Sequence, residues 1–216
     1  RSSAASDVYK RQILKKVSYK VPYMNVISLI WLILMNSGTS EAIKMHKPKI
    51  ALTIAGTDPS GGAGVMADLK SFHSCGVYGM AAITSIIAQN TKGVQHIHNL
   101  ETSWVQEQLD SVFNDELPHA IKTGMIATHE TMELIQHYLK QHSDIPYVID
   151  PVMLAKSGDS LMDDDTKKHL QNTLLPLADV VTPNIPEAEE ITGIKLDTEE
   201  NIRKAGNIFI NEIGSK

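Results

Sequence analysis

A glycine-rich segment offers the clearest chemistry in this sequence, because it could let a ligand approach the main chain. It reads Ala55-Gly-Thr-Asp-Pro-Ser-Gly-Gly-Ala-Gly64 and follows a predicted strand over residues 50–54. Glycine permits close approach and positive φ angles, and the helix predicted next would present unpaired N–H groups to an anion. The spacing matches neither a Walker A loop nor a dinucleotide-binding loop. Two interpretations stay open, a ligand-binding loop and an ordinary tight turn between strand and helix.

Two further side chains, Gln89 and Met125, could contact an aromatic ligand, and Asp68 lies near the start of the predicted helix; each of the three also has an ordinary structural explanation. Gln89, at the end of a predicted buried strand, has a donor and an acceptor that could pair with a heteroaromatic ring edge, or it is a polar strand terminus. Met125, in Lys122-Thr-Gly-Met125, could pack on a ring or lie in the core. Asp68 lies one turn into the predicted helix, where the dipole would keep it ionised even if it only faces solvent.

Polar residues after two later predicted strands suit magnesium and phosphate chemistry. Asp150 directly follows the predicted strand Tyr147-Val-Ile149, and Lys156 lies in the loop after it. Asn184 and Glu187 are three residues apart at another strand-to-helix turn, where Glu187 could bind magnesium through water. The same spacing is typical of an N-cap asparagine with a first-turn glutamate, and local reasoning alone favours that structural explanation.

Other catalytic chemistries find no support in the spacing of the candidate residues. The histidine pairs His96/His98 and His137/His142 have neither neighbouring cysteines nor a partner four residues away, so a histidine metal site is rejected. Cys75, the single cysteine, has no basic neighbour in sequence to activate its thiol. No Gly-x-Ser-x-Gly nucleophile motif occurs.

The elements that must position these residues alternate between strand and helix. Apolar periodicity predicts strands at 50–54, 80–88, 119–123, 147–149 and 179–182, with helices at 65–76, 103–113, 128–142, 163–175, 186–192 and 197–213. Thr128 is predicted to cap its helix, and the spacings Ser103-Trp-Val-Gln106 and Asp197-Thr-Glu-Glu200 resemble capping boxes. Repeated β-α-β units predict an α/β fold, with a mostly parallel sheet and helices on both faces. Ligands bind such sheets at the carboxyl ends of the strands, where the candidate residues lie.

Composition narrows the class of partner. Residues 1–45 carry 7 Lys/Arg and 2 Asp/Glu, whereas the rest carries 13 and 23, so the body is acidic. An acidic body disfavours binding to nucleic acid and favours a small-molecule ligand. A single cysteine suits a reducing compartment.

The first 44 residues are predicted to lie outside the functional domain, which would cover residues 45–216. Val26–Met35 is an apolar run of ten residues, too short to cross a membrane. It fits the core of a secretory signal, but we favour sequence upstream of a true start at Met45. On either interpretation, residues 1–44 carry no function.

In this order, the motifs resemble one family, from about Lys47 to the end of the chain. The segments ALTIAGTDPSGGAG with ADLK, IAQNT, KTGM, VIDPVMLAKSGD and VTPNIPEAE are similar to those of the hydroxymethylpyrimidine and phosphomethylpyrimidine kinases of thiamine biosynthesis. The resemblance implies a ribokinase-like fold, related to the pyridoxine/pyridoxal kinases. It also implies transfer of the γ-phosphate of ATP to the hydroxymethyl group of a pyrimidine, and then to the resulting monophosphate.

The same resemblance assigns the candidate residues to two subsites. Gln89 would bind the ring edge and amino group of the pyrimidine, and Gly56, Ala63, Asp68 and Met125 would line its pocket. The nucleotide side is assigned four residues: Asp150, Lys156, Asn184 and Glu187. Of these, Asp150 and Glu187 would hold Mg²⁺, through water, and Lys156 would lie near the phosphates. Gln89 favours the pyrimidine over pyridoxine; a pyridoxal kinase and a non-catalytic pyrimidine-binding protein are the alternatives.

One departure from the family's pattern affects the expected activity. Family members continue into a Lys-Gly-Gly-His strand and a Gly-Thr-Gly-Cys segment that supplies the anion hole, and their catalytic base lies there too. We therefore expect the ribokinase-like domain to be incomplete at its C-terminus, with the base and anion hole beyond Lys216 and no catalytic residue within the chain. The 216-residue chain is accordingly expected to be inactive. The family also implies a cytoplasmic homodimer when full length.

Overall fold

The computed structural model describes residues 48–153 and 162–214. The chain divides into two units, Arg1–His46 and Lys47–Lys216, and all described residues belong to the second. No helix among the described residues is long and apolar enough to span a membrane.

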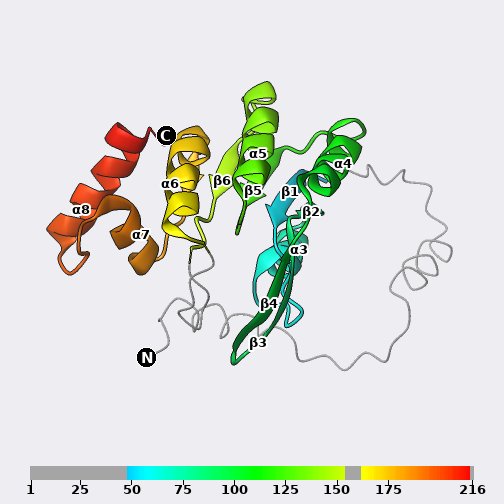
Figure 1. Cartoon of the computed structure of the whole chain (residues 1–216). Coiled ribbons are helices and arrows are strands. Elements are labelled where there is room, and N and C mark those ends of the chain that lie inside the picture. The colour runs from blue at the N-terminus through cyan, green and yellow to red at the C-terminus, as the bar shows by residue number, and fades with distance from the viewer. Residues whose placement is uncertain (1–47, 154–161, 215–216) are drawn as a thin grey trace, which may run out of the picture. The chain divides into compact units, whose positions relative to one another are not determined.

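Five parallel strands form the central sheet, in the order β2-β1-β5-β6-β7 (Figure 1). They are β1 (Ile50–Ala55), β2 (Tyr78–Ile83), β5 (Ala120–Thr123), β6 (Tyr147–Ile149) and β7 (Val180–Val181). Burial on both faces explains why β1 reads as an unbroken apolar run: all six of its residues are buried. The parallel sheet that the β-α-β alternation predicts is confirmed.

Helices cover both faces of the sheet, as predicted. They are α3 (Gly64–Ser74), α4 (Thr102–Phe113), α5 (His129–Gln141), α6 (Asp164–Thr173), α7 (Ile185–Thr192) and α8 (Glu199–Ile208); Leu175–Leu177 form a 3₁₀ turn, and a π-helical turn, Phe209–Ile213, continues α8. On β1, Thr53 donates a hydrogen bond to Asp68 of α3. Its neighbour Leu52 points the other way, into an apolar cluster with Leu109 of α4 and Ile135 of α5.

One predicted strand is wrong. The apolar run over residues 80–88 is divided at Thr84 between β2 and a separate strand, β3 (Ser85–Asn90). Strand β3 leaves the sheet and pairs with β4 (Gly93–Asn99) as an antiparallel hairpin. Apolar character alone cannot distinguish one long buried strand from two short strands that belong to different sheets.

Of the helix N-caps predicted at Thr128, Ser103 and Asp197, the first is confirmed by the structure and the other two are wrong. The Thr128 hydroxyl accepts from the Thr131 N–H at 3.3 Å and caps α5, as predicted. The capping box expected at Ser103 is wrong, because the N-cap of α4 is Glu101 and its side chain makes no capping hydrogen bond. Helix α8 is capped by Thr198 rather than Asp197.

Candidate functional site

The site lies where the chain changes direction across the sheet. Strand β2 lies on one side of β1, whereas β5 and all later strands lie on the other, so β1 and β5 form a topological switch point. Loops that leave the carboxyl ends of two such strands diverge and open a crevice. The glycine-rich loop leaves β1 here, and Met125 follows β5.

Two glycines allow the loop to fold back on itself. Gly64 has φ +56°, and an added Cβ would collide with the carbonyl oxygen of Gly56. That same oxygen accepts the Val65 N–H at 3.0 Å. A Cβ on Gly56 would lie 2.8 Å from Ile87 Cδ1 and 3.5 Å from Met125 Cε, so Gly56 is the point at which the loop, the hairpin and Met125 meet.

Asp58 organises the loop from within. Its carboxylate is buried and accepts the Ser60 N–H at 2.9 Å, the Ser60 hydroxyl at 2.7 Å and the Gly62 N–H at 3.0 Å. Burial by itself would raise the pKa of Asp58, but hydrogen bonds from Ser60, Gln89 and Gly62 outweigh it and lower the pKa below its ordinary value. Sequence reasoning missed this residue, although Asp-Pro-Ser-Gly is a typical aspartate-turn signature.

Gln89 lies on the hairpin rather than at the end of a sheet strand. The β3–β4 register shifts between Ala88 and Gln89, and such a bulge redirects a side chain. The Gln89 side chain is half-buried and lies near enough to Asp58 to help lower the pKa of that carboxylate. The structure therefore connects Gln89 to the glycine-rich loop, but through a hairpin that the sequence did not predict.

Met125 and Ala63 occupy positions next to the same loop. Met125 is only 5% exposed, and its carbonyl oxygen accepts the Thr84 hydroxyl at 3.2 Å. Ala63, half-buried, is the N-cap of α3 and has extended backbone angles without a side-chain cap. The position of Met125 beside the loop is consistent with both explanations, a core residue and a residue that packs on a ring.

The Asp68 carboxylate is paired with other side chains, so the explanation that it only faces solvent is wrong. One oxygen, Oδ2, accepts the Thr53 hydroxyl at 2.6 Å and the Lys122 ammonium at 2.9 Å. Sequence reasoning did not assign Lys122 to the site. A lysine inside a parallel strand, between the buried Ile121 and Thr123, was the signal that could have revealed it.

On the other side of Lys122 lies Asp150, the first of the residues assigned to the nucleotide. Its Oδ2 is 3.8 Å from the Lys122 Nζ. Burial raises the pKa of Asp150; Lys122 opposes this shift and Asp68 adds to it. Lys156 lies outside the described residues.

Asn184 and Glu187 form a reciprocal capping box at the start of α7. The Glu187 N–H donates to Asn184 Oδ1 and the Asn184 N–H donates to Glu187 Oε2, both at 2.9 Å. Glu187 is 2% exposed, and its burial raises its pKa, as does the nearby charge of Asp150. The structural explanation is thereby confirmed, and Glu187 also lies within the electrostatic influence of Asp150.

The acidic residues do not form a cage for a metal ion. Among residues 48–153 and 162–214, no group of three or more His, Cys, Asp or Glu side chains is arranged to hold one. Mg²⁺ commonly binds through one or two carboxylates and completes its shell with water and phosphate oxygens. Asp150, with 38% of its side chain exposed, suits that type of site.

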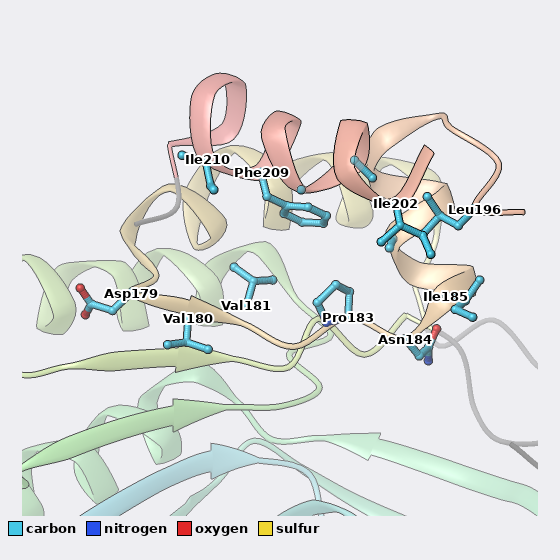
Figure 2. Close-up of a pocket in the computed structure, with 13 residues that line it drawn as sticks. Asp179, Val180, Val181, Pro183, Asn184, Ile185, Leu196, Ile202, Phe209 and Ile210 are labelled. Carbon is cyan, nitrogen blue, oxygen red and sulfur yellow. The ribbon is translucent and has the colours of Figure 1, made fainter. Parts of the chain in front are cut away.

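A separate apolar groove lies beside the outer strand β7, with a volume of about 540 Å³ (Figure 2). Its walls include Val180, Ile202, Phe209 and Ile210 from β7, α8 and the π-helical turn. Asn184 is the one predicted site residue in the described part of its lining. None of the described residues that line the groove is a lysine, arginine or histidine, so they offer no cation to a phosphate group.

Comparison with known proteins identifies what this arrangement resembles. A family model described as phosphomethylpyrimidine kinase matches residues 58–216. A hydroxymethylpyrimidine/phosphomethylpyrimidine kinase of Staphylococcus aureus (strain Mu50) is 81% identical over 172 residues, which cover 80% of this chain and 62% of that protein. The corresponding Escherichia coli (strain K12) protein is 49% identical over 138 residues, or 64% of this chain and 52% of the relative. The chain thus spans less than two thirds of the length of these curated relatives.

Solved structures agree in fold. The crystal structure of phosphomethylpyrimidine kinase from Clostridium difficile 630 matches with a TM-score of 0.73 and 45% identity, covering 78% of this chain and 72% of that one. Pyridoxal kinase from Staphylococcus aureus in complex with ADP matches with a TM-score of 0.70 and 34% identity, covering 79% and 61%. The α/β fold is therefore ribokinase-like, as the sequence motifs implied.

Proposed function

The chain belongs to the phosphomethylpyrimidine kinase family, and from this premise we propose that the protein uses ATP to phosphorylate 4-amino-5-hydroxymethyl-2-methylpyrimidine and then its monophosphate, in thiamine biosynthesis. One observation carries the proposal. Asp68, Lys122 and Asp150 form a continuous charged row at the switch point of the sheet, between the glycine-rich loop and the start of α7. Phosphoryl transfer requires the attacking and leaving oxygens to lie in line on opposite sides of the transferred group, so both substrates must be positioned around one charged centre.

The acceptor binds on the loop side of this row. Gly56 and Ala63 allow close approach to the main chain, and Met125 supplies a polarisable surface for a flat ring. The Gln89 amide offers a donor to a ring nitrogen and an acceptor to the exocyclic amino group. The amide NH₂ has two protons, so Gln89 could donate one to the nearby Asp58 carboxylate and the other to the ring.

ATP and Mg²⁺ bind on the Asp150 side. Asp150 would hold Mg²⁺ directly or through water, and Glu187, whose Oε2 is already engaged by the Asn184 N–H, would act through water. The metal would supply charge stabilisation for the transferred phosphoryl group. Solved pyridoxal kinases are named as complexes with ADP and AMP-PCP, which supports a nucleotide site in this fold. Asn184, at the N-cap of α7, and Lys156 complete the proposed nucleotide subsite.

We expect the whole protein to be a cytoplasmic homodimer that does not bind nucleic acid. The excess of acidic residues after position 45 supports the last expectation, because a phosphate backbone requires clustered cations.

The role of Gln89 can be tested by calorimetry with the pyrimidine alcohol and with pyridoxal. We expect Gln89→Ala to weaken binding of the pyrimidine about tenfold or more, since a hydrogen-bonded pair at the ring edge is lost. Gln95→Ala, an exposed glutamine on the partner strand of the same hairpin, is the matched control and should bind normally.

Phosphoryl transfer is measured separately, as ADP release by the product of the whole gene. Wild-type turnover of the pyrimidine alcohol and its monophosphate supports the proposal. A preference for pyridoxal would replace it with the pyridoxal kinase alternative, which the 34% identical structures support. Tight pyrimidine binding without any turnover would indicate the non-catalytic binding protein instead.

A further inference from the structure

Lys122 lies between the two proposed subsites. Its Nζ is 2.9 Å from Asp68 Oδ2 on the acceptor side and 3.8 Å from Asp150 Oδ2 on the nucleotide side. Within the described ranges, it is the only lysine or arginine in ion-pair contact with both carboxylates. A single cation is therefore shared by two groups that are 82 positions apart in sequence and belong to different subsites.

The strand register explains why the lysine reaches both partners. Lys122 on β5 lies directly opposite Thr53 on β1, so the two side chains point to the same face of the sheet, toward α3. Thr53 and Lys122 both contact Oδ2 of Asp68, which fixes one edge of that carboxylate against the sheet. A carboxylate held through one oxygen can still offer its other oxygen to a ligand.

The electrostatic arrangement argues against a purely structural ion pair. Two carboxylates share one ammonium, so the row keeps a net negative charge. All three groups stay in contact with solvent, with side-chain exposures of 18% for Asp68, 19% for Lys122 and 38% for Asp150. An ion pair that serves only the core is normally sealed and balanced. This row is partly exposed and carries an uneven number of opposite charges instead.

On the basis of the proposed function, we infer that Lys122 is a positioning residue that couples the two subsites. From strand β5 it holds Asp68 in the orientation that receives the pyrimidine alcohol. It also limits the repulsion between Asp68 and Asp150, which keeps the Asp150 carboxylate at its place on the nucleotide side. Lys122 acts on both ligands through these two carboxylates rather than by touching the reacting atoms.

A double-mutant cycle tests this inference in the product of the whole gene. Lys122→Met keeps the length of the side chain and removes its charge, and Asp68→Asn removes the charge of its partner. Binding of the pyrimidine alcohol and of Mg–AMP-PCP is measured by calorimetry for the wild type, both single variants and the double variant. Lys140→Met, at the exposed end of α5, makes the same charge change away from the site.

We expect Lys122→Met to weaken the pyrimidine about tenfold and also to weaken Mg–AMP-PCP. In the Asp68→Asn background, the same substitution should leave pyrimidine binding nearly unchanged but still weaken the nucleotide. Lys140→Met should alter neither ligand. A merely structural lysine would instead weaken both ligands by the same factor in both backgrounds, in step with a lower melting temperature, and that result overturns the inference.

Two further results are decisive. If the wild type binds the pyrimidine and Lys122→Met binds it equally well, the inference fails and the proposed function stands. If the wild type binds no pyrimidine, the proposed function fails and the inference fails with it. Should Lys122→Met not fold, Lys122→Gln takes its place in the same cycle and is judged by the same expected and contrary results.

Discussion

Two buried carboxylates in this site have pKa values shifted in opposite directions, because their neighbours differ. Asp58 is buried and yet has a lowered pKa, because several hydrogen bonds to its carboxylate stabilise the ionised form. Glu187 is also buried and accepts a backbone hydrogen bond, but its pKa is raised, since burial is reinforced by the negative charge of Asp150. The two carboxylates differ in the neighbours that the fold brings to them.

The lowered pKa of Asp58 predicts a specific pH dependence of stability. An ionised Asp58 stabilises the folded state above its ordinary pKa of 3.8, and this contribution is lost as the pH falls through the lowered folded-state value. Asp58→Asn should therefore reduce the free energy of unfolding by about 1–3 kcal/mol at pH 7. The deficit should shrink as the pH falls below 3.8, because the unfolded wild type then takes up a proton at Asp58 that the folded protein resists.

Urea unfolding at a series of pH values measures this difference. Asp144→Asn, an exposed aspartate in the loop before β6, serves as the control and should match the wild type throughout. A deficit for Asp58→Asn that is constant from pH 7 to pH 3 would show that the charge of Asp58 is irrelevant to stability.

The strand-to-helix turn after β1 is the element on which the site depends. Its reversal requires Gly64 at φ +56°, a value that side chains disfavour, and it also brings Gly64 against the Gly56 carbonyl oxygen. Gly193, after α7, has a similar φ of +68° but nothing within 4 Å of an added Cβ. Alanine substitutions at these two glycines therefore distinguish the cost of backbone strain from the cost of steric collision.

We predict that Gly64→Ala destabilises the fold by about 3 kcal/mol or more, because strain and collision add. Gly193→Ala should lose only about 1 kcal/mol, from strain alone. Thermal or chemical unfolding measures both values. Equal losses for the two variants would mean that the loop relaxes and that close packing against Gly56 is unimportant.

For the molecule as a whole, the residues proposed to bind the nucleotide should link ligand binding to global stability. A ligand that binds only the folded state stabilises it by about 2.7 kcal/mol at one hundred times its dissociation constant. We predict that Mg–AMP-PCP raises the melting temperature of the protein and that removing Mg²⁺ with EDTA abolishes most of this increase. Asp150→Asn should lose the increase even with Mg²⁺ present, whereas Asp144→Asn should keep it.

Differential scanning fluorimetry provides the measurement. An Asp150→Asn variant that responds to Mg–AMP-PCP as strongly as the wild type would remove Asp150 from the nucleotide subsite. An undiminished response in EDTA would exclude a role for the divalent cation.

Much of the fold and part of the site could be predicted from the sequence. The apolar runs at β1 and β6, the N-cap at Thr128 and the capping box at Asn184 depend on residues close together in the chain, so their spacing reveals them. The glycine-rich segment likewise predicts a turn, because glycine and aspartate have strong local preferences for turn conformations.

The rest required the tertiary structure. Local periodicity could not show that residues 80–88 belong to two different sheets, nor that Gln89 reaches Asp58 from a hairpin. The pairing of Lys122 with Asp68 joins residues 54 positions apart and arises only because β5 lies beside β1. Strand order is decided by the packing of helices on both faces of the sheet, and that packing energy is shared by the whole chain rather than encoded in any one segment.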